Sequence, residues 1–510
     1  MRVRRLLIWL DTRRLATAIL FVAVFAMAVR APADSDTWWH LKAGQVTVER
    51  GRILQEDLFS HTRYGSPWIN HSWLSQVVLY WLFDRFSYAG LGLWMAAVVV
   101  AAFAFVYLQM EGDVFTRAFI VILAAATSGV IWSARPQLFS FLLTAVVAYL
   151  LYLFKWRRIN RLWLLPPLFI LWVNLHAGYA LGFIILLGFV AGEVLNNLLA
   201  LVPSAGSGHR SPGDDSIVGW KGIGMVILFS LLSVLLLVLN PNTTRMWVYP
   251  FQTARIQILQ QFIQEWQSPD FHPLHTQTFI WMLLATLAAV GLSGRRVDGS
   301  DLVLTGGLAY AALLAGRNIA PFALVAAPTL SRHVAVAVQR WSGAARARGW
   351  LGTPRRRAPT PALGAVNWGL LVLIVALAGV KVYLPLRPGF NEALQRESLP
   401  VGAIEWIQAN PPQGRMFNHY NWGGYLVWRL WPDYRVFVDG RTYLYGDEIL
   451  YDYVEIQAPG PHCEELLGEY EVSFVVTRAG DALSVVLGRT PGWRLVYEDV
   501  MAVIYVWVER

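Results

Sequence analysis

About eleven apolar runs occupy the first 386 residues of this chain, and each is long enough to cross a lipid bilayer. A transmembrane helix needs roughly 20 apolar residues to span about 30 Å of hydrocarbon. The runs begin near residues 15, 89, 118, 137, 162, 177, 222, 278, 302, 318 and 365. The whole chain is 56% hydrophobic and 15% charged, whereas soluble globular chains are about 45 to 50% apolar. We therefore expect an α-helical polytopic membrane protein.

The distribution of Lys and Arg predicts which ends of these helices face the cytoplasm, because cytoplasmic loops carry an excess of positive charge. The N-terminus is predicted to be inside by Arg2, Arg4, Arg5, Arg13 and Arg14. Alternate loops after it are also basic: a loop with Arg117, Lys155 to Arg161, residues 203–221, Arg295 with Arg296, and residues 340–364 with Arg346, Arg348 and Arg355 to Arg357. An odd number of spans then puts residues 32–88, 240–277 and 387–510 outside, in the periplasm or the extracellular space.

Several features limit the class of membrane protein. The first run resembles a secretory signal in its basic start and its small residues near Ala33, but Asp11 and Pro32 favour a permanent anchor. The net charge of +9 does not indicate nucleic-acid binding, because the basic residues lie in short clusters between apolar runs. The single cysteine, Cys463, excludes an intramolecular disulfide and a cysteine-based zinc site. We expect a protein of the plasma (inner) membrane, of bacterial type.

The composition changes after residue 386, where residues 387–510 are predicted to form an external soluble α/β domain. A helix is expected at 400–409 and strands at 415–418, 436–438, 472–477, 494–498 and 501–508, with a turn-rich segment at 422–428. The first external loop, 32–88, is expected to hold two helices that lie on the membrane surface, Asp36 to Arg50 and Ser72 to Phe86. Residues 1–386, with external loops 32–88 and 240–277, are the predicted transmembrane domain.

Two carboxylates, Asp34 and Asp36, stand one residue apart where the first apolar run ends. Such a pair can hold a divalent cation such as Mg²⁺ or Mn²⁺ through oxygen ligands, or one member can act as a general base while the other stays ionised. The alternative is a helix cap, in which Ser35 or Asp36 accepts a hydrogen bond from the backbone of the following helix. His40 follows on the same segment and is a candidate for substrate binding.

Further charged residues are predicted at the external ends of other apolar runs. They are Arg135, His176, Glu265, Asp270 and Arg317. A charge near the membrane is costly without a partner or a water-filled cavity, and a guanidinium can bind a phosphate with two hydrogen bonds. Each arginine alone could be an interfacial anchor. Because two arginines, a histidine and several acids converge on one face, we favour a site, in which Glu265 joins the Asp34 pair and the others bind substrate.

Two glycine-containing segments stand out in the C-terminal part, Asn421 to Tyr425 and Val438 to Arg441. Glycines allow backbone to approach a ligand closely, and a polar turn after a strand is a common binding position in α/β sheets. The alternative is a helix start and a tight turn. The chain contains no GxGxxG, GxxxxGK[ST], GxSxG or HExxH segment, so no local motif supports nucleotide binding or hydrolase chemistry.

The acidic pair after the first span, the helices of the first external loop, the further spans and the outer C-terminal domain together resemble the GT-C superfamily of polytopic membrane glycosyltransferases. This superfamily includes protein mannosyltransferases, aminoarabinose transferases and oligosaccharyltransferases. The segments Trp422 to Trp428 and Val436 to Arg441 resemble those of bacterial membrane proteins grouped with it. The resemblance implies inverting transfer of a sugar from a polyprenyl-phosphate or polyprenyl-diphosphate donor to a glycan, lipid or protein acceptor.

The resemblance also implies roles for individual residues. Asp34 or Asp36 would be the base that activates the acceptor, Glu265 would take the place of an acidic residue in a later external loop, and Arg135 and Arg317 would neutralise the lipid phosphate. Two rival functions remain. A transporter or flippase of lipid-linked saccharides predicts paired ionisable residues near the bilayer midplane and symmetry between halves. A non-catalytic membrane scaffold with an outer binding domain predicts that Asp34 and Asp36 tolerate substitution.

Overall fold

The computed structural model describes residues 2–201, 217–350 and 360–508. The predicted basic cluster Arg355 to Arg357 and most of the predicted inner loop 203–221 lie outside these residues. The α-helices are α1 Arg2–Trp9, α2 Thr12–Ala28, α3 Asp36–Arg50, α4 Trp73–Leu108, α5 Val114–Ser128, α6 Gln137–Trp156, α7 Leu165–Leu175, α8 Tyr179–Ala200, α9 Trp220–Leu236, α10 Arg245–Ala254, α11 Gln257–Phe262, α12 Leu274–Ser293, α13 Gly299–Leu314, α14 Ile319–Ala347, α15 Pro361–Leu386, α16 Pro388–Ser398, α17 Val401–Ala409, α18 Gly423–Leu430, α19 Thr442–Gln457, α20 Cys463–Glu469 and α21 Ala482–Leu487.

Short 3₁₀ helices and four strands complete the secondary structure. The 3₁₀ helices are η1 Gly129–Ile131, η2 Leu162–Leu164, η4 Gln264–Trp266, η5 Gly316–Asn318 and η6 Tyr420–Trp422. The strands are β1 Arg415–Asn418, β2 Val472–Arg478, β3 Trp493–Glu498 and β4 Ala502–Trp507.

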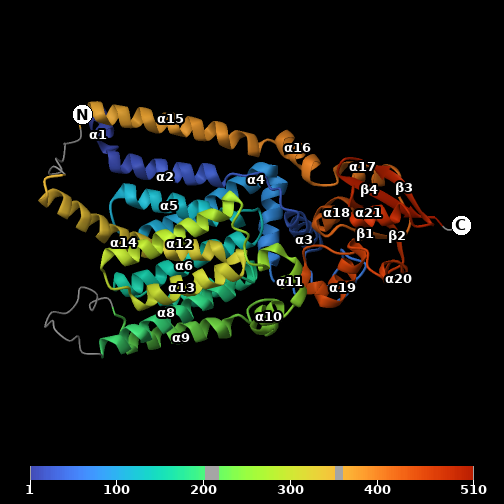
Figure 1. The fold of residues 1–510 in the computed structure, drawn as a ribbon, viewed down its shortest axis with the longest axis horizontal. Helices are drawn as coiled ribbons and strands as arrows, with labels where there is room; N and C mark the ends of the chain where they lie inside the picture. The colour runs from blue at the N-terminus through green and yellow to red at the C-terminus, as the bar shows by residue number, and fades with distance from the viewer. Residues whose placement is uncertain (1, 202–216, 351–359, 509–510) are drawn as a thin grey trace.

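The molecule is a bundle of long helices with a smaller α/β region at one end (Figure 1). The N-terminus lies at the end of the bundle opposite to the C-terminal region, as expected for an odd number of crossings. Among the described residues, seven helices are long and apolar enough to cross a membrane, and shorter apolar helices cover Leu162–Leu175, Trp220–Leu236 and Gly299–Leu314. Together with α2, these helices coincide with the apolar runs of the sequence. The prediction of a polytopic helical membrane protein with a C-terminal α/β region is confirmed.

The first external loop contains both predicted helices. The predicted helix Ser72 to Phe86 is the first part of the 36-residue α4, whose second part is the next span. A kink at Ser87, where φ is +52° and ψ is −145°, separates its two parts. The helix α3 has the predicted bounds, but residues 37–44 on it are all buried. It packs closely on α4 at Gly44, where a Cβ would lie only 2.2 Å from the carbonyl oxygen of Gln76.

One hydrophobic core joins the first external loop to the C-terminal region. Trp38, Leu41 and Phe59 from the loop are at most 1% exposed, and they belong to the same cluster as Ile404 and Leu426. The helix α18 packs on α3, and α17 packs on α18. Burial of side chains this large contributes about 1.5 to 3 kcal/mol each. The loop and the C-terminal region therefore hold each other in place at the end of the bundle.

The C-terminal sheet is mixed, with the strand order β1-β2-β4-β3. β1 runs parallel to β2, with Met416 opposite Phe474, while β4 is antiparallel to both β2 and β3. These strands match four of the five predicted ones. The prediction of a strand at 436–438 is wrong, because this segment pairs with the first external loop: the amide of Val436 donates to the carbonyl of Phe59, 3.0 Å away.

The segment 423–430 is helical as α18, so the prediction of a turn-rich segment is wrong and the alternative for Asn421 to Tyr425, a helix start, is confirmed. The turn was predicted from the two glycines, because glycine is unfavourable inside a helix. Here Gly423 and Gly424 form the first turn of α18, and both touch other backbone: a Cβ would lie 2.2 Å from the carbonyl oxygen of Val438 and 2.3 Å from that of Ser35, respectively. The glycines therefore serve close packing of the helix against its neighbours.

Buried ion pairs lie between the helices α6, α8, α13 and α14. The ammonium of Lys155, which the sequence assigned to a basic loop, is 1% exposed and bound to Glu193 and Asp298. Arg332 of α14 is paired with Asp301 of α13 at 2.5 Å. Because these buried charges are already paired with carboxylates, they connect helices and are not available to bind a ligand.

Candidate active site

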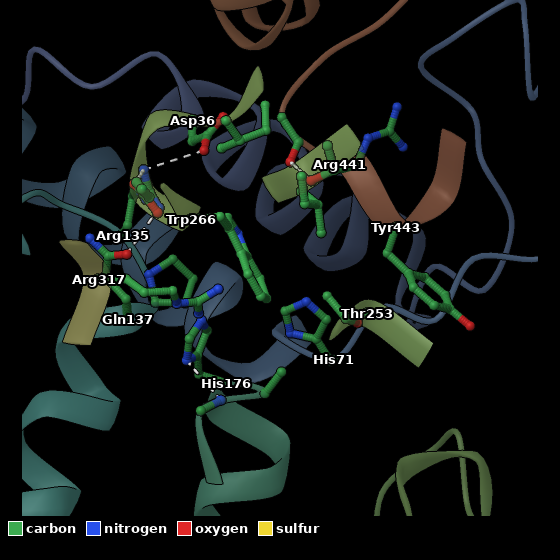
Figure 2. A pocket seen from close by; sticks show the side chains of 18 of the residues that line it. Asp36, His71, Arg135, Gln137, His176, Thr253, Trp266, Arg317, Arg441 and Tyr443 are labelled. Carbon is green, nitrogen blue, oxygen red and sulfur yellow. Dashed lines mark hydrogen bonds and ion pairs between the residues drawn. The ribbon is translucent and has the colours of Figure 1, made fainter. Parts of the chain in front are cut away.

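A cavity of about 1150 Å³ lies where the helical bundle meets the C-terminal region. Separate segments of the bundle line it, at residues 34–40, 68–76, 131–144, 176–184 and 249–266 and around Arg317. The C-terminal region contributes residues 419–421, 440–444 and 450–458. Side chains that are distant in sequence face one open space here (Figure 2). The cavity needs the bundle, the first loop and the C-terminal region together.

Arg135 binds three carboxylates at one end of the cavity. Its Nη1 lies 2.9 Å from Asp34 Oδ2, 3.0 Å from Glu265 Oε1 and 3.4 Å from Asp36 Oδ2. Its Nη2 donates to Gln137 Oε1 at 2.9 Å. Burial disfavours its charge, but the three acids outweigh burial and raise the pKa of Arg135 well above its ordinary value. The guanidinium therefore stays charged and holds these side chains, which come from three distant segments, in one group.

Asp36 differs from its neighbour in its surroundings. Trp39 Nε1 donates to Asp36 Oδ1 at 3.1 Å, and the side chain of Asp36 is 25% exposed. Burial raises the pKa of Asp36 to about 7, against the opposing effect of Arg135 and with help from the charges of Asp34 and Glu265. A carboxyl with a pKa near 7 can exchange a proton at physiological pH, as a general base must.

Asp34 performs the capping role that the sequence left open between Ser35 and Asp36. The carboxylate oxygen Asp34 Oδ1 accepts a hydrogen bond of 2.9 Å from the backbone amide of Asp36, the first residue of α3. Ser35 makes no side-chain capping bond. Because Asp34 also binds Arg135 most closely, its carboxylate is occupied twice. The two acids therefore differ: Asp34 caps the start of α3, and within the described part of the chain Asp36 accepts a hydrogen bond only from Trp39 besides its ion pair with Arg135.

The acidic end does not fit the divalent cation that the sequence suggested for Asp34 and Asp36. Across the described parts of the chain, no group of three or more His, Cys, Asp and Glu side chains is arranged to hold a metal ion. The carboxylates point at Arg135 Nη1 over 2.9 to 3.4 Å, so the position between them is filled by a positive group of the protein itself. A hydrated Mg²⁺ needs near-octahedral oxygen ligands at about 2.0 to 2.1 Å, which this arrangement does not provide.

Arg317 is the second arginine of the cavity, and it has no carboxylate partner. It lies in η5, and the carbon atom of its guanidinium is 4.2 Å from the centre of the Trp266 ring. Among the residues that the structure describes, none forms an ion pair or a hydrogen bond with its side chain. A guanidinium stacked on an indole keeps its N–H donors free at the edges. Arg317 is therefore available to bind an anion.

Four histidines line the cavity, all of them shifted toward the neutral form. Burial, as the main cause, lowers the pKa values of His71 and His419 to about 4 and the pKa values of His40 and His176 well below the ordinary value. The amide of Gly178 donates to His176 Nδ1 at 3.1 Å, so the proton of this neutral ring is on Nε2. Ser140 Oγ lies 2.8 Å from the same nitrogen. Neutral imidazoles at these positions can donate or accept hydrogen bonds without adding charge.

The structure brings most of the predicted site residues together. Those that line the cavity are Asp34, Asp36, His40, Arg135, His176, Glu265 and Arg317. Asp270 does not reach it: its side chain is 63% exposed and pairs with His272 at 2.6 Å. Sequence reasoning missed His71, Trp266 and Tyr443, which carry no motif. It singled out the segment with Gly440 and Arg441, which does line the cavity.

Solved structures show the same fold over nearly the whole chain. The Archaeoglobus fulgidus oligosaccharyltransferase tethered with an acceptor peptide matches with a TM-score of 0.53 at 13% identity, covering 98% of this chain and 75% of that chain. The oligosaccharyltransferase AglB from the same organism, in complex with an inhibitory peptide and a dolichol-phosphate, matches with a TM-score of 0.51 at 12% identity, covering 97% and 74%. ArnT from Cupriavidus metallidurans, bound to undecaprenyl phosphate, gives a TM-score of 0.43 at 10% identity, covering 96% of both chains.

No protein-family model matches the sequence, and no curated protein matches it either. At identities this low, the likeness concerns the fold. It extends through the spans, the first external loop and the C-terminal region, which are the parts on which the sequence resemblance was based. The chain therefore has the fold of the Archaeoglobus fulgidus oligosaccharyltransferase structures.

Proposed function

We propose that this protein is a membrane glycosyltransferase, which transfers a sugar from a polyprenyl-phosphate-linked donor to an acceptor at the external face of the membrane. The observation that carries the proposal is that one cavity holds two functional groups of different kinds. One is the Asp36 carboxyl group, with a pKa near 7, and the other is the Arg317 guanidinium, which has no ion-pair partner among the described residues. Glycosyl transfer from a phosphate-linked donor uses both groups, a base for the acceptor and a positive charge for the leaving phosphate.

In the proposed reaction, Asp36 is the general base. Its carboxylate takes the proton from the nucleophilic group of the acceptor, whose electron pair then attacks the anomeric carbon of the sugar. The bond between that carbon and the phosphate oxygen breaks, and the electron pair leaves with the phosphate. Attack from the side opposite to the leaving group inverts the configuration, and removal of the acceptor proton in the transition state is typically worth about 10² to 10⁴ in rate.

Arg317 stabilises the negative charge that develops on the leaving phosphate. Its donors are unpaired, so a phosphate binds it without displacing a carboxylate. This changes the expectation from the sequence, in which Arg135 and Arg317 both bind the phosphate: Arg135 is already occupied by three acids. AglB, which has this fold, is known in complex with a dolichol-phosphate, and this supports a polyprenyl-phosphate as the ligand here.

The placement of the site supports the external assignment. The C-terminal region and the cavity lie at the end of the bundle away from the N-terminus (Figure 1). The arginines before the first span predict that the N-terminus is inside. We therefore propose that residues 1–386 form the membrane domain, that residues 387–510 form an external α/β domain, and that the donor reaches the cavity from the lipid phase.

The proposal is tested with the purified full-length protein and a panel of polyprenyl-phosphate sugars presented in lipid, with transfer followed by mass spectrometry. Asp36→Asn should abolish transfer, because the amide cannot accept the acceptor proton. Asp270→Asn, at an exposed acid outside the cavity, is the matched control and should transfer at the wild-type rate. Equal transfer by Asp36→Asn and the wild type, with both proteins folded, would contradict the assignment of the base. The absence of transfer by both proteins would favour the rival function of a non-catalytic scaffold.

A further inference from the structure

The C-terminal region touches the Asp36 carboxyl group directly, through a glycine. Gly440 lies in the turn between the extended segment 436–438 and α19. A Cβ atom added to it would lie 1.8 Å from Asp36 Oδ1, 2.6 Å from Asp36 Cγ and 3.0 Å from Asp36 Oδ2. All three nearest atoms belong to the one side chain. No other residue type fits at position 440 while Asp36 keeps its place.

The turn that carries Gly440 is fixed by a buried ion-pair network. Arg441 is bound by Asp439 through its Nε and Nη2, at 2.8 and 2.7 Å, and by Asp57 of the first external loop through its Nη1, at 2.5 Å. The side chains of Asp57, Asp439 and Arg441 are at most 2% exposed. Tyr445 donates a further hydrogen bond of 2.9 Å to Asp439 Oδ2. Since breaking a buried pair of this kind leaves an uncompensated charge, the turn is rigid.

A second glycine of the C-terminal region fixes the backbone next to Asp36. A Cβ at Gly424 would lie 2.3 Å from the carbonyl oxygen of Ser35 and 3.1 Å from Trp39 Cδ1. Trp39 is the residue that donates a hydrogen bond to Asp36. The residue before Asp36, its carboxyl group and its hydrogen-bond donor thus all rest against glycines of the C-terminal region.

From these contacts we infer that the C-terminal region is a working part of the active site, in which Gly440 is a positioning residue for the Asp36 carboxyl group. The inference rests on the proposed function, which makes Asp36 the base. The backbone at Gly440 excludes water from one side of the carboxyl group and limits its side-chain rotamers. The buried network around Arg441 transmits this restraint from the first external loop.

The contact is tested without any transfer assay by a double-mutant cycle of Gly440→Ala and Asp36→Ala in the full-length protein. Thermal unfolding in detergent is the measurement. Gly440→Ala alone should lower the melting temperature, because its methyl group overlaps Asp36. In the Asp36→Ala background the overlapping atoms are gone, so adding Gly440→Ala should cost little or nothing. If Gly440→Ala alone fails to fold, recovery of a folded protein in the double variant supports the same conclusion.

Two glycine variants serve as controls for the cycle. A Cβ at Gly423 would meet the backbone oxygen of Val438 and two atoms of Asp439, none of which Asp36→Ala removes. Gly423→Ala should therefore destabilise the protein equally in both backgrounds. Gly468 in α20 has no neighbour within 4 Å of a Cβ, so Gly468→Ala should keep the wild-type melting temperature. A loss with Gly440→Ala that is the same with and without the Asp36 carboxyl group would overturn the inference.

The transfer rate provides a second measurement, which would not change if the contact were only structural. Because displacement of a reacting group by about 1 Å can cost about 10²-fold in rate, Gly440→Ala should lower kcat by about 10²-fold with KM for the donor nearly unchanged. The pH midpoint of kcat should move as well, since the surroundings of Asp36 change. Failure of the wild type to transfer any sugar would count against the proposed function, while coupling in the unfolding cycle would still establish the contact. Transfer that depends on Asp36 without coupling would count against this inference alone.

Discussion

Arg135 and Arg317, two of the arginines that line the cavity, have very different surroundings. Arg135 has three carboxylates within 3.4 Å, whereas Arg317 rests on the ring of Trp266 and has no ion-pair partner among the described residues. Their sequence contexts are alike, since each follows an apolar run and stands at the start of another helix. The difference teaches that residue type and predicted sidedness do not assign a role. A paired guanidinium organises the protein, and an unpaired one is free for a ligand.

Of the two arginine variants, Arg135→Ala should have the larger effect on both stability and transfer. It leaves Asp34, Asp36 and Glu265 facing one another without a positive charge. Their side chains are 23%, 25% and 46% exposed, so we expect a loss of about 2 kcal/mol in stability, below the roughly 3 to 5 kcal/mol for fully buried pairs. Transfer should fall by about 10³-fold, because the base loses its position. Thermal unfolding and the initial transfer rate measure the two effects; an active, fully stable variant would refute the pairing role.

Arg317→Ala should reduce transfer without reducing stability. Removal of one donor that stabilises developing charge costs about 10² to 10³ in kcat, and the donor should also bind less tightly. The unfolding temperature should be unchanged or slightly higher, because an unpaired charge in the cavity is removed. The binding of an unsubstituted polyprenyl phosphate, measured by calorimetry, isolates the phosphate contact from the chemistry. Equal losses of stability in Arg135→Ala and Arg317→Ala would contradict the different roles proposed for the two arginines.

The pH profile should distinguish the two arginines again. A base works in its deprotonated form, and the pKa of Asp36 is raised to about 7, so kcat should rise with pH through a midpoint near 7. Arg135 lowers the pKa of Asp36, so a variant without this charge should have a higher midpoint. Arg317 is not among the groups that shift Asp36, and Arg317→Ala should keep the wild-type midpoint while its rate falls. Rate–pH curves between pH 5 and 9 for the three proteins are the measurement. A pH midpoint for Arg135→Ala below that of the wild type would contradict this prediction.

The sequence predicted the spans well, because they follow from local properties, and it predicted that the site residues lie at one end of the bundle. An apolar run of about 20 residues has few options other than a buried helix, and alternating basic loops fix the order of inside and outside. For the same reason the sequence brought Asp34, Arg135, Glu265 and Arg317 to one face. It could not show that three carboxylates bind Arg135. This grouping depends on side-chain contacts between residues that are 101 and 130 positions apart in the chain.

The errors in the C-terminal region have one physical cause. The segment 436–438 has the composition of a strand, but its backbone pairs with Phe59 of the first external loop. The glycines of α18 suggest a turn, but they allow contact with Ser35. In each case a partner more than 350 positions away decides the local structure, as tertiary contacts override propensity. The sequence shows that position 440 is a glycine. The structure gives the reason, because the Asp36 carboxyl group occupies the space that a Cβ would need.

The smallest expected effect is that of removing divalent cations. The positive charge among the carboxylates is a guanidinium, so a chelator such as EDTA should change the transfer rate of the wild type less than about twofold, a shift of under about 0.5 kcal/mol in barrier. The matched variant is Arg135→Ala, in which three carboxylates face an empty position and provide oxygen ligands for a hard cation. Added Mn²⁺ or Mg²⁺ should restore part of its lost stability and should do nothing for Arg317→Ala, because no carboxylate lies within ion-pair distance of Arg317 among the described residues. A wild-type protein that stops transferring in EDTA and recovers with Mn²⁺ would show that the acids bind a metal during turnover, and Arg135 would then have to leave them.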